Sequence, residues 1–415
     1  MLAALLAVAV LGPGADPAPV PRESPSVTPE QVRRAVERSL PFLEEEGVAW
    51  MADRRCNSCH TVTFQVWAHA DAAARGLPVD RPKLEGWTRW SLADSLSGRY
   101  WFKLRPRTLR ELKEEGIPES VVSRLGPIVD KTYLKEQELL SALGEALGPT
   151  NLESYGRRLV RRAALPNNGG GPDTLAQLLL AGAPRPGDRD PEGAEAESFA
   201  AIGSLLLEWQ EPEGYWEAAG QMPNMRRSKA ENDEVTTMWS VLALADAEGA
   251  GDPAARARQK ALAWLKGGGR APGVSTEWLL LRMLIERRFG DPGRSAELLA
   301  VLLDEQRPDG GWGWLRKAGR SDAFATGQVL YALGVAGRDG EDPSVRKAWD
   351  FLLASQAEDG SWCVPTAAIS VSAAPGRVVR TDAVYTYWGT AWAAIGLLRT
   401  LPGDAAPRPS TGSRL

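Results

Sequence analysis

The sequence predicts an all-α fold in which outer and inner helices form two concentric rings, an (α/α)6 toroid. Apolar residues recur at spacings of three and four from Pro29 to about Leu398, and alternating strand patterns are scarce. A second observation is the motif Gln-x-x-x-Gly-x-Trp, which occurs at residues 210–216, 306–312 and 356–362. Its glutamines are 96 and then 50 residues apart. These gaps fit a helical-pair repeat of about 48 to 50 residues with one motif copy skipped.

Each repeat contains two kinds of helix. A helix with one charged face, such as "SVRKAWDFLLASQ", leads into the motif, and a helix that is apolar nearly all round, such as "DAFATGQVLYALGV", follows it. A helix with a charged face lies outside, whereas one that is apolar on every side is buried. Helices of the buried kind are expected near residues 60–76, 172–182, 235–247, 275–289, 323–335 and 386–399, with a further candidate near 118–133. Six outer–inner pairs would close a ring.

The N-terminal residues predict export, and the chain between its two ends is expected to form a single folded domain. The first eleven residues, "MLAALLAVAVL", are apolar over the length of a signal-peptide core, and a Pro-rich stretch follows them. We therefore expect a signal peptide and linker over residues 1–27, one toroid domain over 28–402 and a disordered tail over 403–415. The destination is the periplasm or another exported location, where membrane association remains open.

The charge balance argues against a nucleic-acid partner. Lys and Arg total 49 against 53 Asp and Glu. The arginine pairs at 157–158 and 161–162 have helical spacing without interleaved aromatic residues, which is typical of a solvated helix face.

The Gln-x-x-x-Gly-x-Trp motifs resemble the QW repeats of squalene-hopene cyclases and their relatives, the terpenoid cyclase and protein prenyltransferase toroids. The resemblance covers residues from about Phe199 to Pro402. It implies that each Gln caps the end of an outer helix and that each Trp stacks against the next repeat. Large aromatic side chains also dominate packing in general, so these tryptophans are expected to be structural.

The same resemblance points to a candidate acid. Class II cyclases protonate their substrate with an Asp-x-Asp-Asp motif, and the chain reads "ENDEV" before an inner helix. Asp233 falls on the central position, while Glu231 and Glu234 stand where the family has aspartates. Acidic residues before a helix are also common N-terminal caps. The prenyltransferase zinc ligands and the thioester motif of complement-like toroids have no counterpart here, since both histidines, His60 and His69, lie near the N-terminus.

The stretch "CNSCH" predicts covalent attachment of one haem c. Cys56 and Cys59 are spaced to reach the two vinyl groups of a porphyrin, and His60 follows at once as the axial iron ligand. A zinc site would need two further ligands, and only Cys363 and His69 remain. A redox disulfide normally accompanies a βαβ pattern, which is missing. The segment around the motif also resembles that of planctomycete-type bacterial proteins in which such a motif leads into a QW toroid, and this resemblance implies a single haem.

The sixth ligand of the iron is open between two possibilities. His69 lies nine residues after His60, about 13 Å along one helix, and is therefore expected to be no ligand. Loops from outer to inner helices should converge near the haem, and the loop 211–233 carries Met222 and Met225. Either methionine is a possible sixth ligand. The alternatives are a five-coordinate iron and methionines that merely fill gaps.

Three functions follow from these patterns. The first is an exported monohaem c-type cytochrome on the toroid, which transfers electrons to a redox partner protein or small molecule, or carries out redox chemistry in the toroid cavity. The second is an enzyme on a terpenoid or another hydrophobic ligand, with Asp233 as the acid beside Glu231 and Glu234. The third is a haem-based module that binds or senses a gas without catalysis.

Overall fold

The computed structural model describes most of the chain between Val27 and Pro402. The described residues are 27–54, 61–96, 100–102, 104, 109–110, 112–113, 116–129, 134, 136–166, 171–182, 193–218, 225–245, 252–267, 270–317, 319–369 and 378–402.

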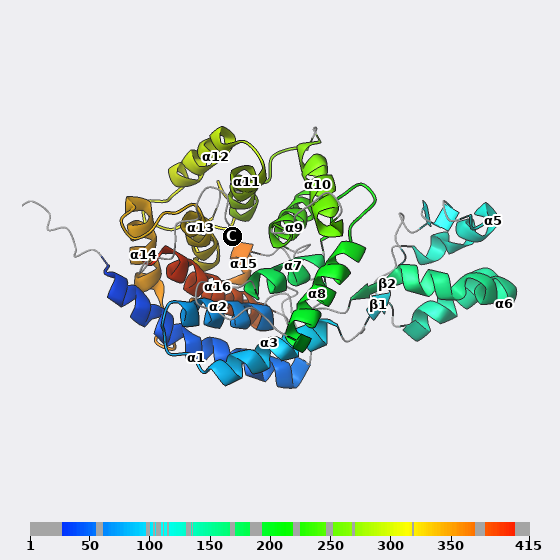
Figure 1. Ribbon diagram of the computed structural model, residues 1–415, viewed down its shortest axis with the longest axis horizontal. Helices are drawn as coiled ribbons and strands as arrows, with labels where there is room; N and C mark the ends of the chain where they lie inside the picture. The colour runs from blue at the N-terminus through cyan, green and yellow to red at the C-terminus, as the bar shows by residue number, and fades with distance from the viewer. Residues whose placement is uncertain are drawn as a thin grey trace, which may run out of the picture.

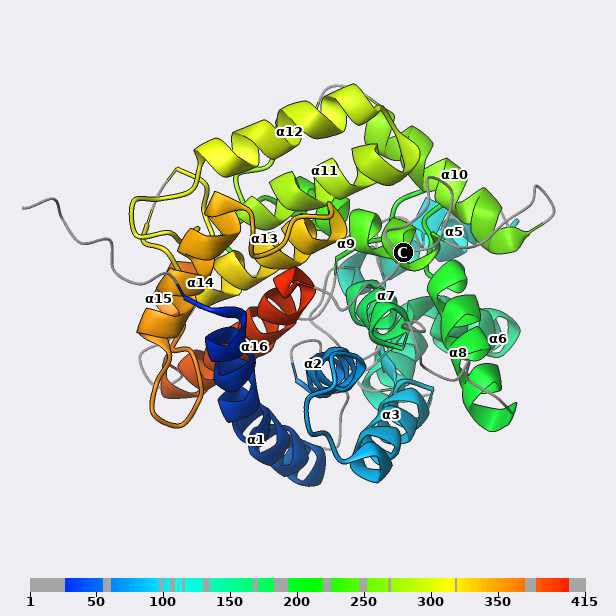
Figure 2. The ribbon, with the colours of Figure 1, turned by 60° about the vertical axis from the view of Figure 1, so that its left-hand side comes forward.

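Helices form two concentric rings, which Figure 2 shows nearly end-on. The inner ring consists of α2 (Val62–Ala74), α7 (Pro172–Ala181), α9 (Lys229–Ala243), α11 (Thr276–Phe289), α13 (Ala323–Val335) and α16 (Val378–Thr400). The outer ring consists of α1 (Pro29–Arg54), α3 (Arg81–Ser95), α8 (Gly193–Glu208), α10 (Pro253–Lys266), α12 (Pro292–Asp304) and α14 (Pro343–Ser355). Each inner helix contacts the next, and α16 contacts α2. The ring therefore closes after six pairs, which confirms the predicted toroid.

Four of the six outer helices begin with the same local signal. An aspartate caps the helix through its carboxylate and a proline follows within the first two helical positions, where its missing N–H costs nothing. The capping residues are Asp80 of α3, Asp252 of α10, Asp291 of α12 and Asp342 of α14. In α14 the buried residues Val345, Ala348, Trp349 and Leu352 then recur at helical spacing. One face turns to the inner ring and the other to solvent, as the sequence pattern predicts.

The motif turns connect successive outer helices. The Gln306 side-chain amide donates to the carbonyls of Gly310, at 2.8 Å, and of Ser344 in the next outer helix, at 2.7 Å. Gln210 and Gln356 repeat this pattern with Ala257 and Ala35. The motif tryptophans Trp216, Trp312 and Trp362 are buried, and each indole donates to the carbonyl ten residues earlier. The structural role implied for these residues is confirmed.

The motif glycine has a steric reason. Gly310 has φ +89°, and a Cβ there would lie 2.1 Å from the carbonyl oxygen of Lys347 in the next outer helix. Gly360 has φ +84°, with a Cβ position 2.0 Å from the carbonyl of Arg38. Glycine adopts positive φ without penalty and leaves room for this close approach.

The N- and C-terminal ends of the chain are tied together in the ring. Gln356 donates to Ala35 of α1, and Tyr387 of α16 donates to the carbonyl of Leu43. Arg399 of α16 makes two hydrogen bonds, of 2.8 and 2.9 Å, to the Asp71 carboxylate of α2. Helices α13 and α16 approach so closely that a Cβ on Gly396 would meet the Gly327 carbonyl at 2.2 Å.

An insertion separates α3 from α7 and projects to one side of the ring (Figure 1). It contains β1 (Tyr100–Phe102), α5 (Glu119–Val122), the 3-10 helix η1 (Ser123–Ile128), α6 (Glu136–Ala163) and β2 (Ala164–Pro166). Strands β1 and β2 pair antiparallel, with Tyr100 opposite Pro166. Its buried leucines form a second hydrophobic core apart from that of the ring.

Two expectations about inner helices need correction. The candidate near 118–133 forms α5 and η1, which pack in the core of the insertion and not in the ring. The apolar residues of this segment are buried as expected, but they lie in the core of the insertion. The inner helix expected at 235–247 begins at Lys229 and ends at Ala243, because its polar first turn is helical and capped by Ser228.

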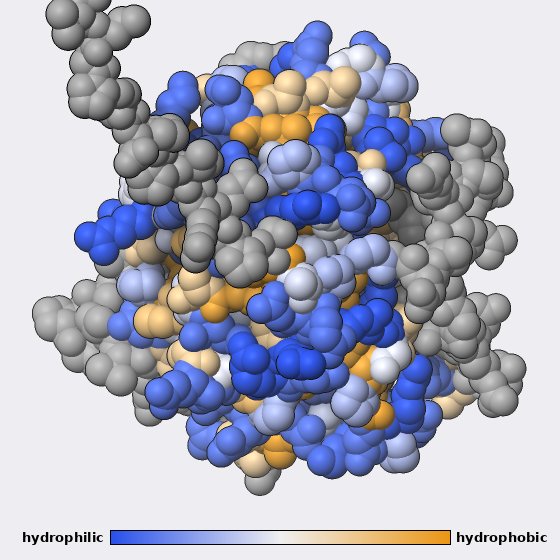
Figure 3. Space-filling model, turned by 90° about the vertical axis from the view of Figure 1, so that its left-hand side faces the viewer, coloured by the Kyte–Doolittle hydropathy of each residue, from blue (hydrophilic) through white to orange (hydrophobic). Residues whose placement is uncertain are grey.

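Figure 3 shows one face on which hydrophilic side chains surround separate apolar patches. Among the described helices, none combines the length and the apolar character that a membrane span requires. The short helix α15 (Thr366–Ile369) lies in the connection from α14 to α16.

Candidate functional site

The Cys-x-x-Cys-His motif, predicted to attach haem, falls between outer helix α1 and inner helix α2 in the sequence. Cys56, Cys59 and His60 themselves lie outside the described residues. Helix α1 ends at Arg54, and α2 begins at Val62 directly after the motif. The prediction of an inner helix near residues 60–76 is therefore confirmed, because α2 runs from Val62 to Ala74.

Aromatic side chains fill the ring beside α2. Trp67, Trp239, Tyr331 and Trp392 come from four different inner helices, and every pair of them is in ring contact, with centroids 5.4 to 6.4 Å apart. All four are buried. At this depth the centre of the ring is packed by aromatic rings.

A second aromatic row begins in the first turn of α2. The Phe64 ring lies 5.6 Å from that of Trp388, which lies 4.8 Å from Phe324. Phe324 is 5.3 Å from Trp314, and the Arg227 guanidinium lies 4.7 Å from the centre of the Trp314 ring. The helix that follows the haem motif is thus connected through aromatic contacts to a buried arginine.

Arg227 forms an ion pair with Glu277 inside the protein. Its Nη1 lies 2.7 Å from Glu277 Oε2, and both side chains are fully buried. The other oxygen of Glu277 accepts hydrogen bonds of 3.0 Å from Trp239 Nε1 and Gln328 Nε2. A buried pair needs such additional hydrogen bonds, because its desolvation is costly.

The sequence patterns did not single out this pair. Arg227 stands in a loop, and Glu277 follows the N-cap Ser275 as an ordinary first-turn acid would. Helix α11 carries four further charged residues, so a charge at position 277 does not by itself mark a buried partner.

Comparison with known proteins gives one family match. Residues 279–407 match the family model of the squalene-hopene cyclase C-terminal domain. The fold is squalene cyclase-like. The matched segment starts in α11 and includes two of the three motif turns.

Other comparisons add little to this match. The chain is similar to a solved structure described as a possible member of the GH105 family from Salmonella enterica subsp. enterica serovar Paratyphi A. The identity is 13%, the similarity covers 94% of this chain and 99% of that one, and the TM-score is 0.33. A similarity at this level implies nothing about function. No curated protein matches the chain.

Asp233, which the sequence predicted as a candidate acid, is hydrogen-bonded through both carboxylate oxygens. Its Oδ1 accepts a hydrogen bond of 3.0 Å from the backbone N–H of Ala218, and its Oδ2 lies 2.8 Å from Lys229 Nζ. Burial raises the pKa of Asp233, while these two donors oppose the rise.

The bond from Asp233 to Ala218 is one of a repeated set. In each repeat the residue two after the motif tryptophan donates its N–H to an inner-helix side chain: Ala218 to Asp233, Trp314 to Asp322 and Val364 to Thr386. Four residues later, a threonine hydroxyl accepts from the motif tryptophan N–H in all three repeats: Thr237, Thr326 and Thr390. Asp233 therefore occupies an anchoring position of the repeat, where threonine also serves.

Glu231 and Glu234 point away from Asp233. Glu231 accepts hydrogen bonds of 2.9 and 2.7 Å from the backbone N–H and the hydroxyl of Ser275. Glu234 pairs with Arg270 and accepts from the Trp278 indole. Glu231 and Glu234 thus hold the N-terminal end of α11, and Asp233 holds the connection that precedes α9. This arrangement favours a structural role.

Of the two methionines predicted as possible iron ligands, only Met225 lies among the described residues. Met222 lies outside the described residues. Met225 is fully buried, and its carbonyl accepts from Trp314 Nε1 at 2.9 Å. Its sulfur lies 3.7 Å from Arg227 Nη2. Ligation of iron by either residue stays a prediction.

His69 lies on a different side of α2 from Phe64 and Trp67. Its Nδ1 donates to the Gln65 carbonyl at 2.8 Å, and its ring packs edge-on against Trp87 of α3 at 4.9 Å. Burial lowers the pKa of His69. Its surroundings are outer helices, which agrees with the expectation that it packs between helices.

Metal ligands do not gather anywhere in the described part of the chain. Among those residues, no group of three or more His, Cys, Asp or Glu side chains is placed to hold a metal ion. The candidate haem ligands lie in the connection between α1 and α2, which this observation does not cover.

Proposed function

We propose that this protein is an exported monohaem c-type cytochrome built on a squalene cyclase-like toroid. Cys56 and Cys59 would anchor the haem covalently, and His60 would be its axial ligand. The haem would supply one-electron transfer at iron. The observation that carries the proposal is the Cys-x-x-Cys-His run directly before an inner helix.

The residues that follow the motif suit a porphyrin. Val62 and Phe64, in the first turn of α2, are fully buried, and Phe64 opens the aromatic row through Trp388. An apolar core that begins two residues after His60 would exclude water from the side of the haem next to α2.

Haem content and attachment give the direct test. After co-expression with a c-type maturation system, haem should remain on the denatured protein through acid–acetone extraction. The double variant Cys56→Ala/Cys59→Ala should lose it, whereas Cys363→Ala, at an exposed cysteine elsewhere, should keep it. Haem that extracts freely from the wild-type protein, or zinc in its place, would refute the proposal.

The open side of the iron decides between electron transfer and gas binding. With a methionine ligand, replacing Met222 or Met225 should open the iron to carbon monoxide. With a five-coordinate iron, the wild-type protein should bind carbon monoxide directly, and both methionine variants should behave as wild type. The second outcome would favour the gas-binding module.

A second candidate is chemistry on a terpenoid or another hydrophobic ligand, which the family match at residues 279–407 favours. Asp233 would be the acid, beside Glu231 and Glu234. Asp233→Asn should then abolish turnover of a polyprene substrate while Asp322→Asn, at the equivalent anchor of the next repeat, leaves it. All three carboxylates are engaged in hydrogen bonds or ion pairs, which makes this candidate weaker than the cytochrome.

A further inference from the structure

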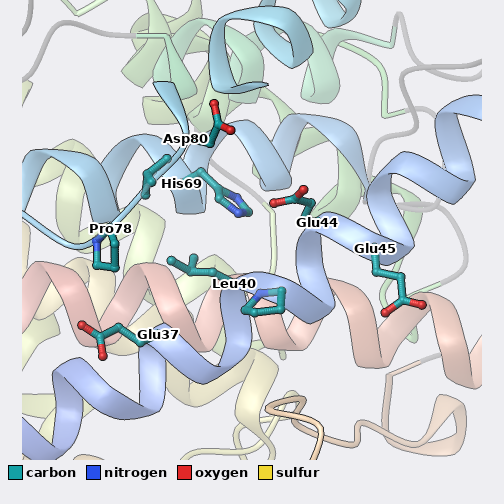
Figure 4. Close-up of a pocket in the computed structure, with 9 residues that line it drawn as sticks. Glu37, Leu40, Glu44, Glu45, His69, Pro78 and Asp80 are labelled. Carbon is teal, nitrogen blue, oxygen red and sulfur yellow. The ribbon is translucent and has the colours of Figure 1, made fainter. Parts of the chain in front are cut away.

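A groove opens between α1 and the turn that follows α2 (Figure 4). Its volume is about 460 Å³, within the range of small-ligand pockets. Leu40, Pro41, Pro78 and Val79 form apolar parts of its wall, and the imidazole of His69 lies at its base.

The polar groups of the groove are almost all anionic. Glu37, Glu44, Glu45 and Asp80 line it, and neither lysine nor arginine does. Glu44 pairs with Lys83 outside the groove, and Asp80 accepts from the backbone N–H of Lys83 as the cap of α3. Within the described part of the chain, no ion pair engages Glu37 or Glu45, and both are exposed.

Glu37 and Glu45 are eight residues apart on α1, or about 12 Å along the helix. Figure 4 shows them at separate places along the groove, with Pro41 of the same helix between them in the chain. Proline has no N–H, so Pro41 leaves the carbonyl of Glu37 without its helical donor. The groove therefore combines hydrogen-bond acceptors and negative charge with apolar wall residues. Such a surface suits an ammonium group on an aliphatic stem.

We infer that this groove receives a lysine side chain from a basic partner protein. The stem would pack on Leu40 and Val79, and the ammonium group would pair with one of the exposed carboxylates, Glu37 or Glu45. The site lies on α1 and α2, the two helices that the candidate haem connection joins. That the partner is a redox protein rests on the proposed function, whereas the preference for a lysine rests on the groove alone. Charge complementarity of this kind steers association and fixes orientation.

Titration calorimetry of the full chain with tetralysine tests the groove at low ionic strength. Wild-type protein should bind the peptide, and Glu37→Gln/Glu45→Gln should bind it about five- to tenfold more weakly, because two exposed charges are removed. The matched control Glu341→Gln/Glu358→Gln removes two exposed acids from other parts of the surface and should change nothing. Haem content, measured separately by absorption, reports on the proposed function, so the two can fail independently.

Three comparisons can overturn the inference. A tetrapeptide of 2,4-diaminobutyric acid carries the same charge on a shorter stem and should bind several-fold more weakly than tetralysine; equal binding would mean that no stem enters the groove. Hexylamine that binds as tightly as the peptide would indicate a small-molecule site instead of a protein-docking site. Binding that is unaffected by the groove variants would place the cation elsewhere.

Discussion

The two halves of the ring close it by different means. From α8 to α16, three connections from outer to inner helices use the same turn, with the same glutamine, tryptophan and threonine hydrogen bonds. From α1 to α7, the corresponding connections lack the motif. One carries Cys56–His60, and the other carries an insertion with its own core. Three equivalent turns thus hold the repeated half together, whereas the other half carries the Cys-x-x-Cys-His motif and an added segment at the corresponding places.

A motif tryptophan should be the costliest side chain to remove. Trp362 is buried and bonds to Leu352 and Thr390, so Trp362→Ala should lower the free energy of unfolding by about 3 to 5 kcal/mol. Denaturant unfolding measures this. The control Trp90→Ala, at a half-buried tryptophan of α3, should cost clearly less. Equal losses would contradict the view that the repeated turns carry the ring.

Two glycines with positive φ allow the stability cost of close packing to be measured apart from the cost of the backbone conformation. Gly310→Ala places a Cβ against the Lys347 carbonyl and should destabilise the protein by about 3 kcal/mol. Gly116 in the insertion has φ +80° with nothing within 4 Å of a Cβ, so Gly116→Ala should cost only about 1 kcal/mol. Melting temperatures report both. A milder effect at Gly310 than at Gly116 would mean that the turn can move away from the next outer helix.

Asp322 should make the repeated half sensitive to pH. Burial raises the pKa of this carboxyl to about 6 from its ordinary 3.8. The folded protein then binds more protons than the unfolded chain between about pH 4 and 6, so stability should fall as pH rises through this window, by up to about 3 kcal/mol.

Asp322→Asn should flatten that pH dependence, which unfolding curves at several pH values would show. Asp359 provides the contrast, since hydrogen bonds from Ser361 lower the pKa of this exposed carboxyl. Asp359→Asn should leave the slope between pH 4 and 6 in place. A wild-type protein that becomes more stable from pH 4 to 6, with the same slope in Asp322→Asn, would show that other groups control this window.

The sequence predicted the parts of the fold that depend on local periodicity. The inner helices and the turns follow from apolar spacing and from a motif whose glycine has a steric reason. The segment 118–133 was assigned to the wrong core, because periodicity shows that a helix is buried but not against what. The pair Arg227–Glu277 joins a loop to a helix 50 residues later, and nothing local marks such a contact.

The smallest expected effect concerns His69, which lies in the half that carries the haem motif. Helix α2 is continuous from Val62 to Ala74, so His69 is held about 10 Å along the axis from the start of the helix and faces Trp87 and α1. In the haem-loaded protein, His69→Ala should therefore leave the iron absorption and low-spin signals unchanged. It should cost only modest stability, because one hydrogen bond to Gln65 and the contact with Trp87 are lost. His69→Gln keeps a polar group there and should be milder still. Loss of the low-spin signal in both variants would make His69 an iron ligand, which the continuous helix forbids unless α2 unwinds when haem binds.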